Sequence, residues 1–208
     1  TFGAKIGAVI FTDSEKVVLT ENQNVFIGRT ENSIDLKEYS GATVYSISCG
    51  GYYLGNDASS LDLDGEFKTN KTVHGNNTVS ALIEKDGRFY SLQIPVTVIT
   101  AEISDVSALK ELLDSDSAEY AVYGYYKLIS NLGDDSYKLS NGNGKNWQNV
   151  DGLYGFRGTL DGNGNSISGT AEINGLFGLV GKGAVIKNLT VNAYGYSDGR
   201  TVFFGRSS

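Results

Sequence analysis

The chain has 208 residues, with 27 Gly, one Pro, one Cys and no Met, and its formal net charge is −7. This length suits one large domain or two ordinary ones. An acidic chain without a basic stripe is not expected to bind nucleic acid, because nothing would neutralise the phosphates. No apolar run approaches the length of a membrane span, so we expect no membrane insertion. Abundant turn formers beside β-branched and aromatic residues predict a mainly β protein.

Six short runs within the first hundred residues are rich in β-branched or aromatic residues and are bounded by turn formers. They predict strands at Ile6–Thr12, Val17–Thr20, Asn24–Gly28, Ala42–Cys49, Thr78–Glu84 and Phe89–Ile99. In the last two, apolar and polar residues alternate, which indicates a sheet with one buried face. Lys85-Asp86-Gly87-Arg88 has the composition of a hairpin turn between them. Short strands with turns about every ten residues are typical of an Ig-like β-sandwich.

Three segments of this region are similar to a bacterial Ig-like domain: Ser40–Val44, His74–Val79 and Ile94–Thr100. In such repeats a G-x-N-T-V strand is followed by a hairpin and an exit strand, and residues 75–79 fit that motif. The resemblance implies a β-sandwich over residues 1–101.

A second domain is expected over residues 102–208, beginning with the one convincing helix of the chain. Apolar residues at positions 106, 109, 112 and 113 fall on one helical face, and charged residues at 110 and 111 lie opposite. Ser104 or Asp105 can cap the first turn. The next segment, Tyr123–Ile129, has the β-propensity of a strand.

The last sixty residues repeat. Gly152-Leu153-Tyr154-Gly155 recurs as Gly175-Leu176-Phe177-Gly178 and as Val202-Phe203-Phe204-Gly205, about 23 and about 27 residues apart, a spacing typical of solenoid turns. A second match aligns Leu160-x-Gly-x-Gly-x-x-Ile167 with Leu179-x-Gly-x-Gly-x-x-Ile186. Alternation over residues 189–193 predicts a strand with Leu189, Val191 and Ala193 facing inward.

Residues 156–167, 175–178 and 183–191, in that order, are similar to the GLUG-type repeat proteins. The helix and the Gly124–Leu128 segment match the cap usually found before the first turn of such a repeat. The resemblance implies the capped start of a right-handed parallel β-helix with one short helix, on a bacterial surface.

Cys49 lies in a strand-like run, where a free thiol is either a small buried hydrophobe or a reactive group. The only histidine, His74, lies in a polar segment, so no nucleophile–base pair is indicated.

Two acidic segments contain ligand types that calcium prefers. Asp161-Gly162-Asn163-Gly164-Asn165 has alternating oxygen-bearing side chains but lacks the later Glu of an EF-hand, and a solenoid corner explains it equally. Asp57, Asp62, Asp64 and Glu66 form either a calcium site or a solvated loop. We expect no metal or other cofactor.

Because parallel β-helices include polysaccharide-cleaving enzymes, converging carboxylates and cations were sought. The only nearby candidates are Asp151, Arg157, Asp161 and Lys182, and they form no recognisable constellation. We therefore expect no catalytic residues and no enzyme.

Aromatic residues are dense around the second domain and could stack on sugar rings. They are Tyr120, Tyr123, Tyr125, Tyr126, Trp147 and Tyr154. Packing in the cap and core is the alternative explanation for the same residues.

These patterns and resemblances predict a non-catalytic fragment of an extracellular or cell-surface bacterial protein that acts in adhesion or as a structural spacer. The partner would be a host or plant glycan or a surface protein. The alternative is the N-terminal part of a carbohydrate-active β-helix enzyme, or a carbohydrate-binding module. An open last turn of the solenoid would also favour self-association at the C-terminal end.

Overall fold

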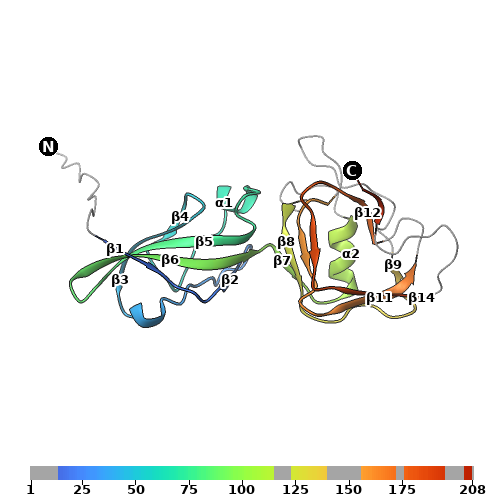
Figure 1. The fold of residues 1–208 in the computed structure, drawn as a ribbon, viewed down its shortest axis with the longest axis horizontal. Coiled ribbons are helices and arrows are strands. Elements are labelled where there is room, and N and C mark those ends of the chain that lie inside the picture. The colour runs from blue at the N-terminus through green and yellow to red at the C-terminus, as the bar shows by residue number, and fades with distance from the viewer. Residues whose placement is uncertain (1–13, 115–122, 140–155, 172–175, 195–203, 208) are drawn as a thin grey trace.

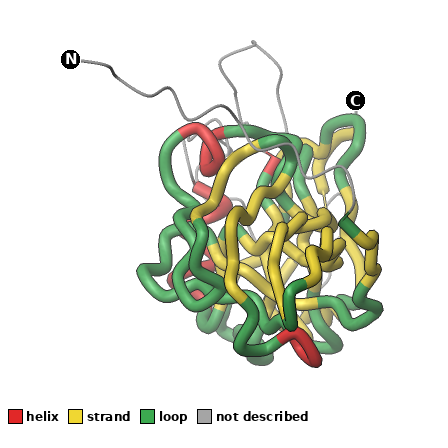
Figure 2. The backbone as a smooth tube through the Cα atoms, turned by 90° about the vertical axis from the view of Figure 1, so that its left-hand side faces the viewer, coloured by secondary structure: helices red, strands yellow, loops and turns green. Residues whose placement is uncertain are grey.

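The computed structural model describes residues 14–114, 123–139, 156–171, 176–194 and 204–207. The protein is mainly β, as predicted, with mixed and parallel sheets. Figure 1 shows two units along the long axis, with β6 leading into β7 between them. Turned by 90°, the chain in Figure 2 is mostly strand and loop, and helix is confined to short segments.

The N-terminal unit contains one six-stranded sheet with the order β1-β6-β5-β3-β4, in which β2 also pairs with β6. Its elements are β1 (Glu15–Val18), β2 (Gln23–Phe26), η1 (Lys37–Tyr39), β3 (Thr43–Cys49), β4 (Tyr52–Gly55), α1 (Glu66–Thr69), β5 (Gly75–Lys85) and β6 (Arg88–Ile99). The β5–β6 hairpin is antiparallel throughout, whereas β1 and β2 run parallel to β6. The hairpin turn predicted at 85–88 is present, with positive φ at Asp86 and Gly87.

Pro95 lies inside β6, although proline removes a backbone donor from a sheet. Leu19 N donates to Gln93 O, so the odd-numbered residues of β6 direct their backbone groups toward β1 and β2. β1 ends opposite Gln93 and β2 begins opposite Val96. Pro95 therefore sits at the break between the two partner strands, where no donor is required.

One face of this sheet is covered by the segments between the strands. Buried strand residues such as Ile47, Val79 and Leu92 form one cluster with Leu36 and Phe67 from the connecting loops and α1. The described residues place all six strands in a single sheet, so the second sheet that a sandwich requires is not among them. The strand predicted at Ile6–Thr12 lies outside the described residues.

Three elements of this unit, η1, β4 and α1, were not expected from the sequence. β4 follows the turn at Gly50 and Gly51 and is only four residues long, too short for a visible alternation. α1 is a single turn that buries Phe67 against Tyr52, with the ring centroids 6.0 Å apart. The prediction of one short helix was therefore incomplete, because a single turn that buries one aromatic residue is too short to show helical periodicity.

The C-terminal unit consists of short strands that pair in parallel. Its elements are β7 (Ala101–Ile103), α2 (Val106–Asp114), β8 (Tyr125–Leu128), β9 (Lys138–Leu139), β10 (Thr159–Asp161), β11 (Ser166–Ala171), β12 (Phe177–Val180), β13 (Val185–Lys187), β14 (Thr190–Tyr194) and β15 (Phe204–Ser207). They form three sheets, ordered β13-β10-β8-β7, β14-β11-β9 and β12-β15. Within each sheet, strands from successive segments of the chain thus pair in parallel.

The register confirms one predicted repeat and corrects the other. Phe177 pairs with Phe204, which is the predicted interval of about 27 residues. The 19-residue match is wrong as a stacking register, because Leu160 pairs with Ile186 and not with Leu179. That match aligned the β10–β11 corner with the similar β12–β13 corner. The two corners connect different pairs of sheets.

A second cluster of buried side chains fills this unit, and α2 contributes to it. Leu109 and Leu112 pack with inward residues such as Leu128, Leu160 and Ile167. The predicted alternation in β14 is confirmed, because Val191 and Ala193 pack against the cluster while Thr190 and Asn192 are exposed. Asp105 caps α2, its Oδ1 accepting from the N–H groups of residues 107 and 108 at 2.9 Å.

Candidate functional site

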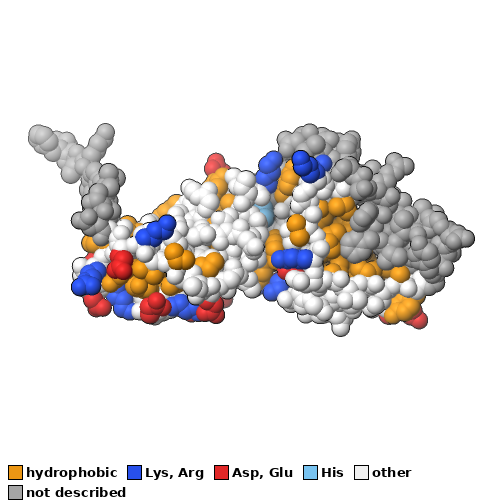
Figure 3. Space-filling view, viewed as in Figure 1, with side chains coloured by type: hydrophobic (Ala, Val, Ile, Leu, Met, Phe, Trp, Pro, Cys, Tyr) orange, Lys and Arg blue, Asp and Glu red, His pale blue; other side chains and the backbone are white. Residues whose placement is uncertain are grey.

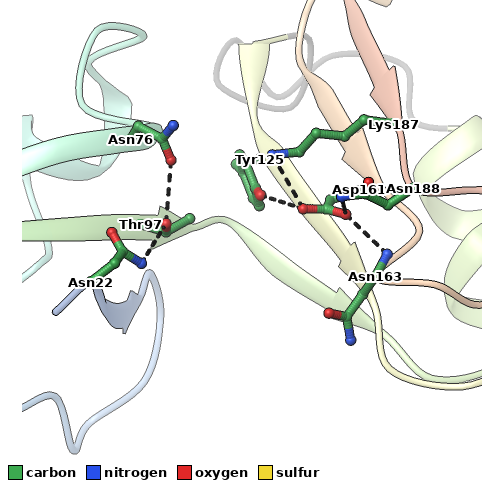
Figure 4. A network of polar contacts seen from close by, with 8 residues as sticks. All are labelled: Asn22, Asn76, Thr97, Tyr125, Asp161, Asn163, Lys187 and Asn188. Carbon is green, nitrogen blue, oxygen red and sulfur yellow. Dashed lines mark hydrogen bonds and ion pairs between the residues drawn. The ribbon is translucent and has the colours of Figure 1, made fainter.

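Asp161 ends β10 at a corner of the C-terminal unit, where four donors converge on its carboxylate (Figure 4). The Tyr125 hydroxyl donates to Oδ2 at 2.6 Å, and Lys187 Nζ lies 3.3 Å from the same oxygen. Oδ1 accepts from Asn163 N at 2.9 Å and from Asn188 Nδ2 at 3.0 Å. The Asp161 side chain is 11% exposed. We refer to these five residues as the Asp161 cluster.

Parallel strand pairing brings the cluster together. The register of β8, β10 and β13 places Lys127, Asp161 and Lys187 side by side. Tyr125 stands two residues before Lys127 and so faces the same side of the sheet.

The tight corner after β10 depends on backbone conformations that most residues avoid. Asn163 and Asn188 both have φ of 52°, in the left-handed region that Asn tolerates better than most side chains. A Cβ on Gly162 would lie 2.4 Å from the carbonyl oxygen of Asn188, so only glycine fits there. At this corner the backbone at Gly162 is therefore in direct contact with the backbone at Asn188.

Electrostatics keep the Asp161 carboxyl group ionised. Burial alone raises its pKa, but hydrogen bonds from Tyr125, Asn163 and Asn188 and the charge of Lys187 outweigh burial and lower the pKa to about 2. The pKa of Tyr125 is raised, first by burial and then by its hydrogen bond to Asp161. The pKa of Lys187 is raised, chiefly by its hydrogen bond with Tyr125.

This arrangement is unsuited to the calcium site considered for Asp161–Asn165. Both carboxylate oxygens already accept hydrogen bonds from the chain, and a cation would face the Lys187 ammonium. A carboxyl group with a pKa of about 2 is also a poor general acid at neutral pH. The cluster instead fastens three turns of the C-terminal unit to one another.

Tyr125 also connects the cluster to the N-terminal unit. Its N–H donates to Thr100 Oγ1 at 2.8 Å, and Thr100 N donates to its carbonyl oxygen at 2.8 Å. The Thr100 hydroxyl lies 2.8 Å from His74 Nδ1. A Cβ on Gly75 would lie 3.2 Å from the Tyr125 ring, so the ring packs directly under that glycine.

An ion pair and a cation–π contact flank this junction. Arg29 Nη2 lies 2.5 Å from Glu102 Oε2, and the Arg29 guanidinium stacks 3.6 Å above the Phe26 ring. A second cation–π contact joins the two units, with Lys71 Nζ 5.0 Å from the centroid of the Tyr123 ring. Side chains of the two units therefore meet at several points around Thr100.

The second acidic segment forms no metal site in the part of the chain that the structure describes. Asp57, Asp62 and Asp64 line a hollow of about 430 Å³, with Arg29 on its rim. Asp57 Oδ1 accepts from Ser59 N and Oγ, and Asp62 Oδ1 accepts from Asp64 N. Glu66 begins α1. The carboxylates thus organise the loop itself.

Among the candidates for an enzyme site that the structure describes, Arg157 and Asp161 do not converge. Arg157 precedes β10 and donates through Nη1 to the carbonyl oxygen of Lys182 at 3.3 Å, whereas Asp161 ends β10. Four residues of extended chain separate Arg157 from Asp161, a distance of about 13 Å. Asp151 lies outside the described residues.

Of the six aromatic residues for which sugar stacking and packing were the two explanations, the structure describes Tyr123, Tyr125 and Tyr126. Tyr125 and Tyr126 are buried, and the Tyr126 ring lies 6.2 Å from that of Phe156. These two are packing residues, as the alternative explanation held. Tyr120, Trp147 and Tyr154 lie outside the described residues. Cys49 is buried, and burial raises its pKa to about 11, which makes it the inert hydrophobe of the two options.

Sequence reasoning singled out Asp161 but missed its partners Lys187 and Asn188, and it missed Thr100. A signal for the first two was present: Leu160-Asp161 and Ile186-Lys187 are both an apolar residue followed by a charge before a Gly or Asn corner. Nothing in the sequence pattern distinguished Thr100.

No protein-family model, curated protein or solved structure matches this chain. Within the described residues, no helix has the length and apolar character needed to span a membrane.

Proposed function

We propose that the chain is a non-catalytic module of a bacterial cell-surface or secreted protein, in which an Ig-like domain presents the start of a right-handed parallel β-helix. The domains would be residues 1–101 and 102–208, and the role that of an adhesive spacer. The separate buried clusters of the two units, which divide between Val98 and Ala101, support this boundary. The parallel, in-register turns of the C-terminal unit support the β-helix.

The observation that carries the proposal is the fixed junction. Only Thr100 separates β6 from β7, and its backbone and hydroxyl are both bonded to Tyr125. Domains joined by few contacts are expected to move independently. A junction held by hydrogen bonds and an ion pair instead fixes the orientation of one domain relative to the other. A spacer that presents a second domain requires such a fixed orientation.

The polar side chains of the C-terminal unit also favour a structural role over catalysis. The Asp161 cluster satisfies its charges internally. The Arg157 side chain donates to the backbone carbonyl oxygen of Lys182, and this contact is not part of the cluster. An active site would need such groups directed at a substrate.

NMR relaxation and small-angle X-ray scattering of the whole chain test the junction. We expect one rotational correlation time for both units and scattering that fits one rigid elongated particle. Thr100→Val removes the hydroxyl contacts and should raise the radius of gyration, whereas Thr190→Val, an exposed threonine in β14, should leave it unchanged. Two independent correlation times in the unaltered protein would refute a rigid spacer.

A further inference from the structure

The six-stranded sheet has a second face, opposite the buried cluster, that no other described element covers with a hydrophobic layer. Strand registers define a row of outward residues across it: Tyr53 pairs with Ser48, Ser48 with Ser80, Ser80 with Gln93, and Gln93 with Val18. Their neighbours along the strands, such as Ile47 and Val79, point to the core. We refer to this row as the outer row.

Both ends of the outer row are strongly exposed. Tyr53 on β4 is 65% exposed and Val18 on β1 is 63% exposed. No described residue hydrogen-bonds the hydroxyl of Tyr53 or that of Ser48. Strands lie about 4.8 Å apart, so the row spans roughly 19 Å. That is the scale of a short extended oligomer, not of a single small molecule.

A second exposed tyrosine lies three residues from Ser48 toward the hairpin end, on the residue that bulges from β3. Tyr45 is 42% exposed, and its hydroxyl donates to Glu84 Oε2 at 2.6 Å. Its ring centroid lies 5.7 Å from that of Phe89. These contacts fix the ring in place, so little conformational entropy would be lost if a ligand packed against it.

The residues of the outer row are themselves uncharged, and the next row toward the hairpin contains Lys16, two residues from Val18 on β1, and Leu82 on β5. The central groups of the outer row are hydroxyls and an amide, with Ser80 Oγ bonded to Gln93 Oε1 at 3.2 Å. Thr78 and Pro95 adjoin the row on one side. Charged outward residues, Lys16 and Glu84, stand nearer the hairpin end. On the side of this unit that faces the viewer in Figure 3, charges of both signs are interspersed, without a large area of one sign.

We propose that this outer face binds an uncharged oligosaccharide laid across the strands. Tyr53 offers an exposed ring to the C–H face of a sugar, and the Ser48 hydroxyl offers a hydrogen-bonding group to its hydroxyls. The strand spacing is close to the length of one sugar residue in an extended chain. The inference deepens the adhesive role proposed above by naming the ligand class and the site, and it rests on that role.

The test is binding of soluble neutral oligosaccharides (cellohexaose, xylohexaose, mannohexaose) and charged ones (heparin and polygalacturonate fragments) to the whole chain, followed by NMR shift mapping. Tyr53→Ala should weaken binding of a neutral oligosaccharide about tenfold. Tyr194→Ala is the matched control, because Tyr194 is 45% exposed on the C-terminal unit. Both tyrosines are exposed, so neither change should impair folding.

Shifts at the Ser48, Ser80 and Gln93 signals on titration with a neutral oligosaccharide would support the site. Equal binding by the Tyr53→Ala and unaltered proteins would overturn it, as would binding of charged fragments only. Failure of every neutral oligosaccharide, or dimerisation lost on Tyr53→Ala in sedimentation experiments, would also overturn it. The scattering result for the junction is independent of all of these, so the spacer proposal can stand if the glycan site falls.

Discussion

Replacing Asp161 with alanine isolates what the Asp161 cluster contributes to stability. The carboxyl pKa falls from 3.8 to about 2 on folding, which at about 1.36 kcal/mol per pKa unit corresponds to roughly 2 kcal/mol at neutral pH. The variant also leaves the Tyr125 hydroxyl without its acceptor. We therefore expect Asp161→Ala to destabilise the C-terminal unit by about 3 kcal/mol at pH 7.

The sign of the pH dependence follows from the lowered pKa. The stabilisation is fully present above pH 3.8, where the unfolded carboxyl group is ionised, and is lost as the pH falls through about 2. Urea unfolding followed by the methyl NMR signals of Leu160 and Ile167 reports on this unit alone. The difference between unaltered and variant protein should shrink by roughly 2 kcal/mol between pH 5 and pH 2.

A matched control separates this effect from the loss of any acidic side chain. Asp135 is exposed on the same unit, and Asp135→Ala should change stability by less than about 0.5 kcal/mol at every pH. If the unaltered protein and Asp161→Ala lost stability in parallel as the pH fell, the carboxylate would not be the stabilising group, and the interpretation of the cluster would be wrong.

Three further changes test other features. Gly162→Ala should cost more than about 2 kcal/mol in urea unfolding because its Cβ meets the Asn188 carbonyl, whereas Gly164→Ala, at φ 82° with open space around it, should cost about 1 kcal/mol. The buried Cys49 should not react with Ellman's reagent until the protein is unfolded. Burial lowers the pKa of His74 from 6.5 to about 4, so stability should be full above pH 6.5 and decline toward pH 4. His74→Gln should abolish that decline in urea unfolding followed by the methyl signals of Val79 and Leu92, which belong to the buried cluster of the N-terminal unit.

The sequence predicted strands best where one face is buried and the other is wet. The β5–β6 hairpin was found because alternation continues through both strands and the turn at Asp86-Gly87 needs positive φ. β4 escaped because four residues after a double glycine show no period. Long-range pairing, which decides whether such a segment becomes a strand, leaves no local mark.

The candidate site was harder to predict than the fold. Asp161 was visible as an acid in a Gly-Asn corner, but its partners come from residues 36 and 27 positions away in the chain. Their convergence depends on the register of parallel turns, and the repeat suggested a false register for Leu160. With a different register, Asp161 would pair with other residues and the cluster would not form.

The two polar regions of this chain differ in where their hydrogen bonds go, and that difference separates structure from binding. Asp161 gives both oxygens to donors of its own chain, so a ligand would have to break existing bonds. Tyr53 and Ser48 present hydroxyls that no described residue engages, and the Tyr53 side chain is strongly exposed among the described residues. Buried polar groups must be satisfied internally, but exposed ones have no such requirement and can be matched to a partner. The outer face of the N-terminal sheet, and not the acidic corner that the sequence marked, is therefore where recognition is to be sought.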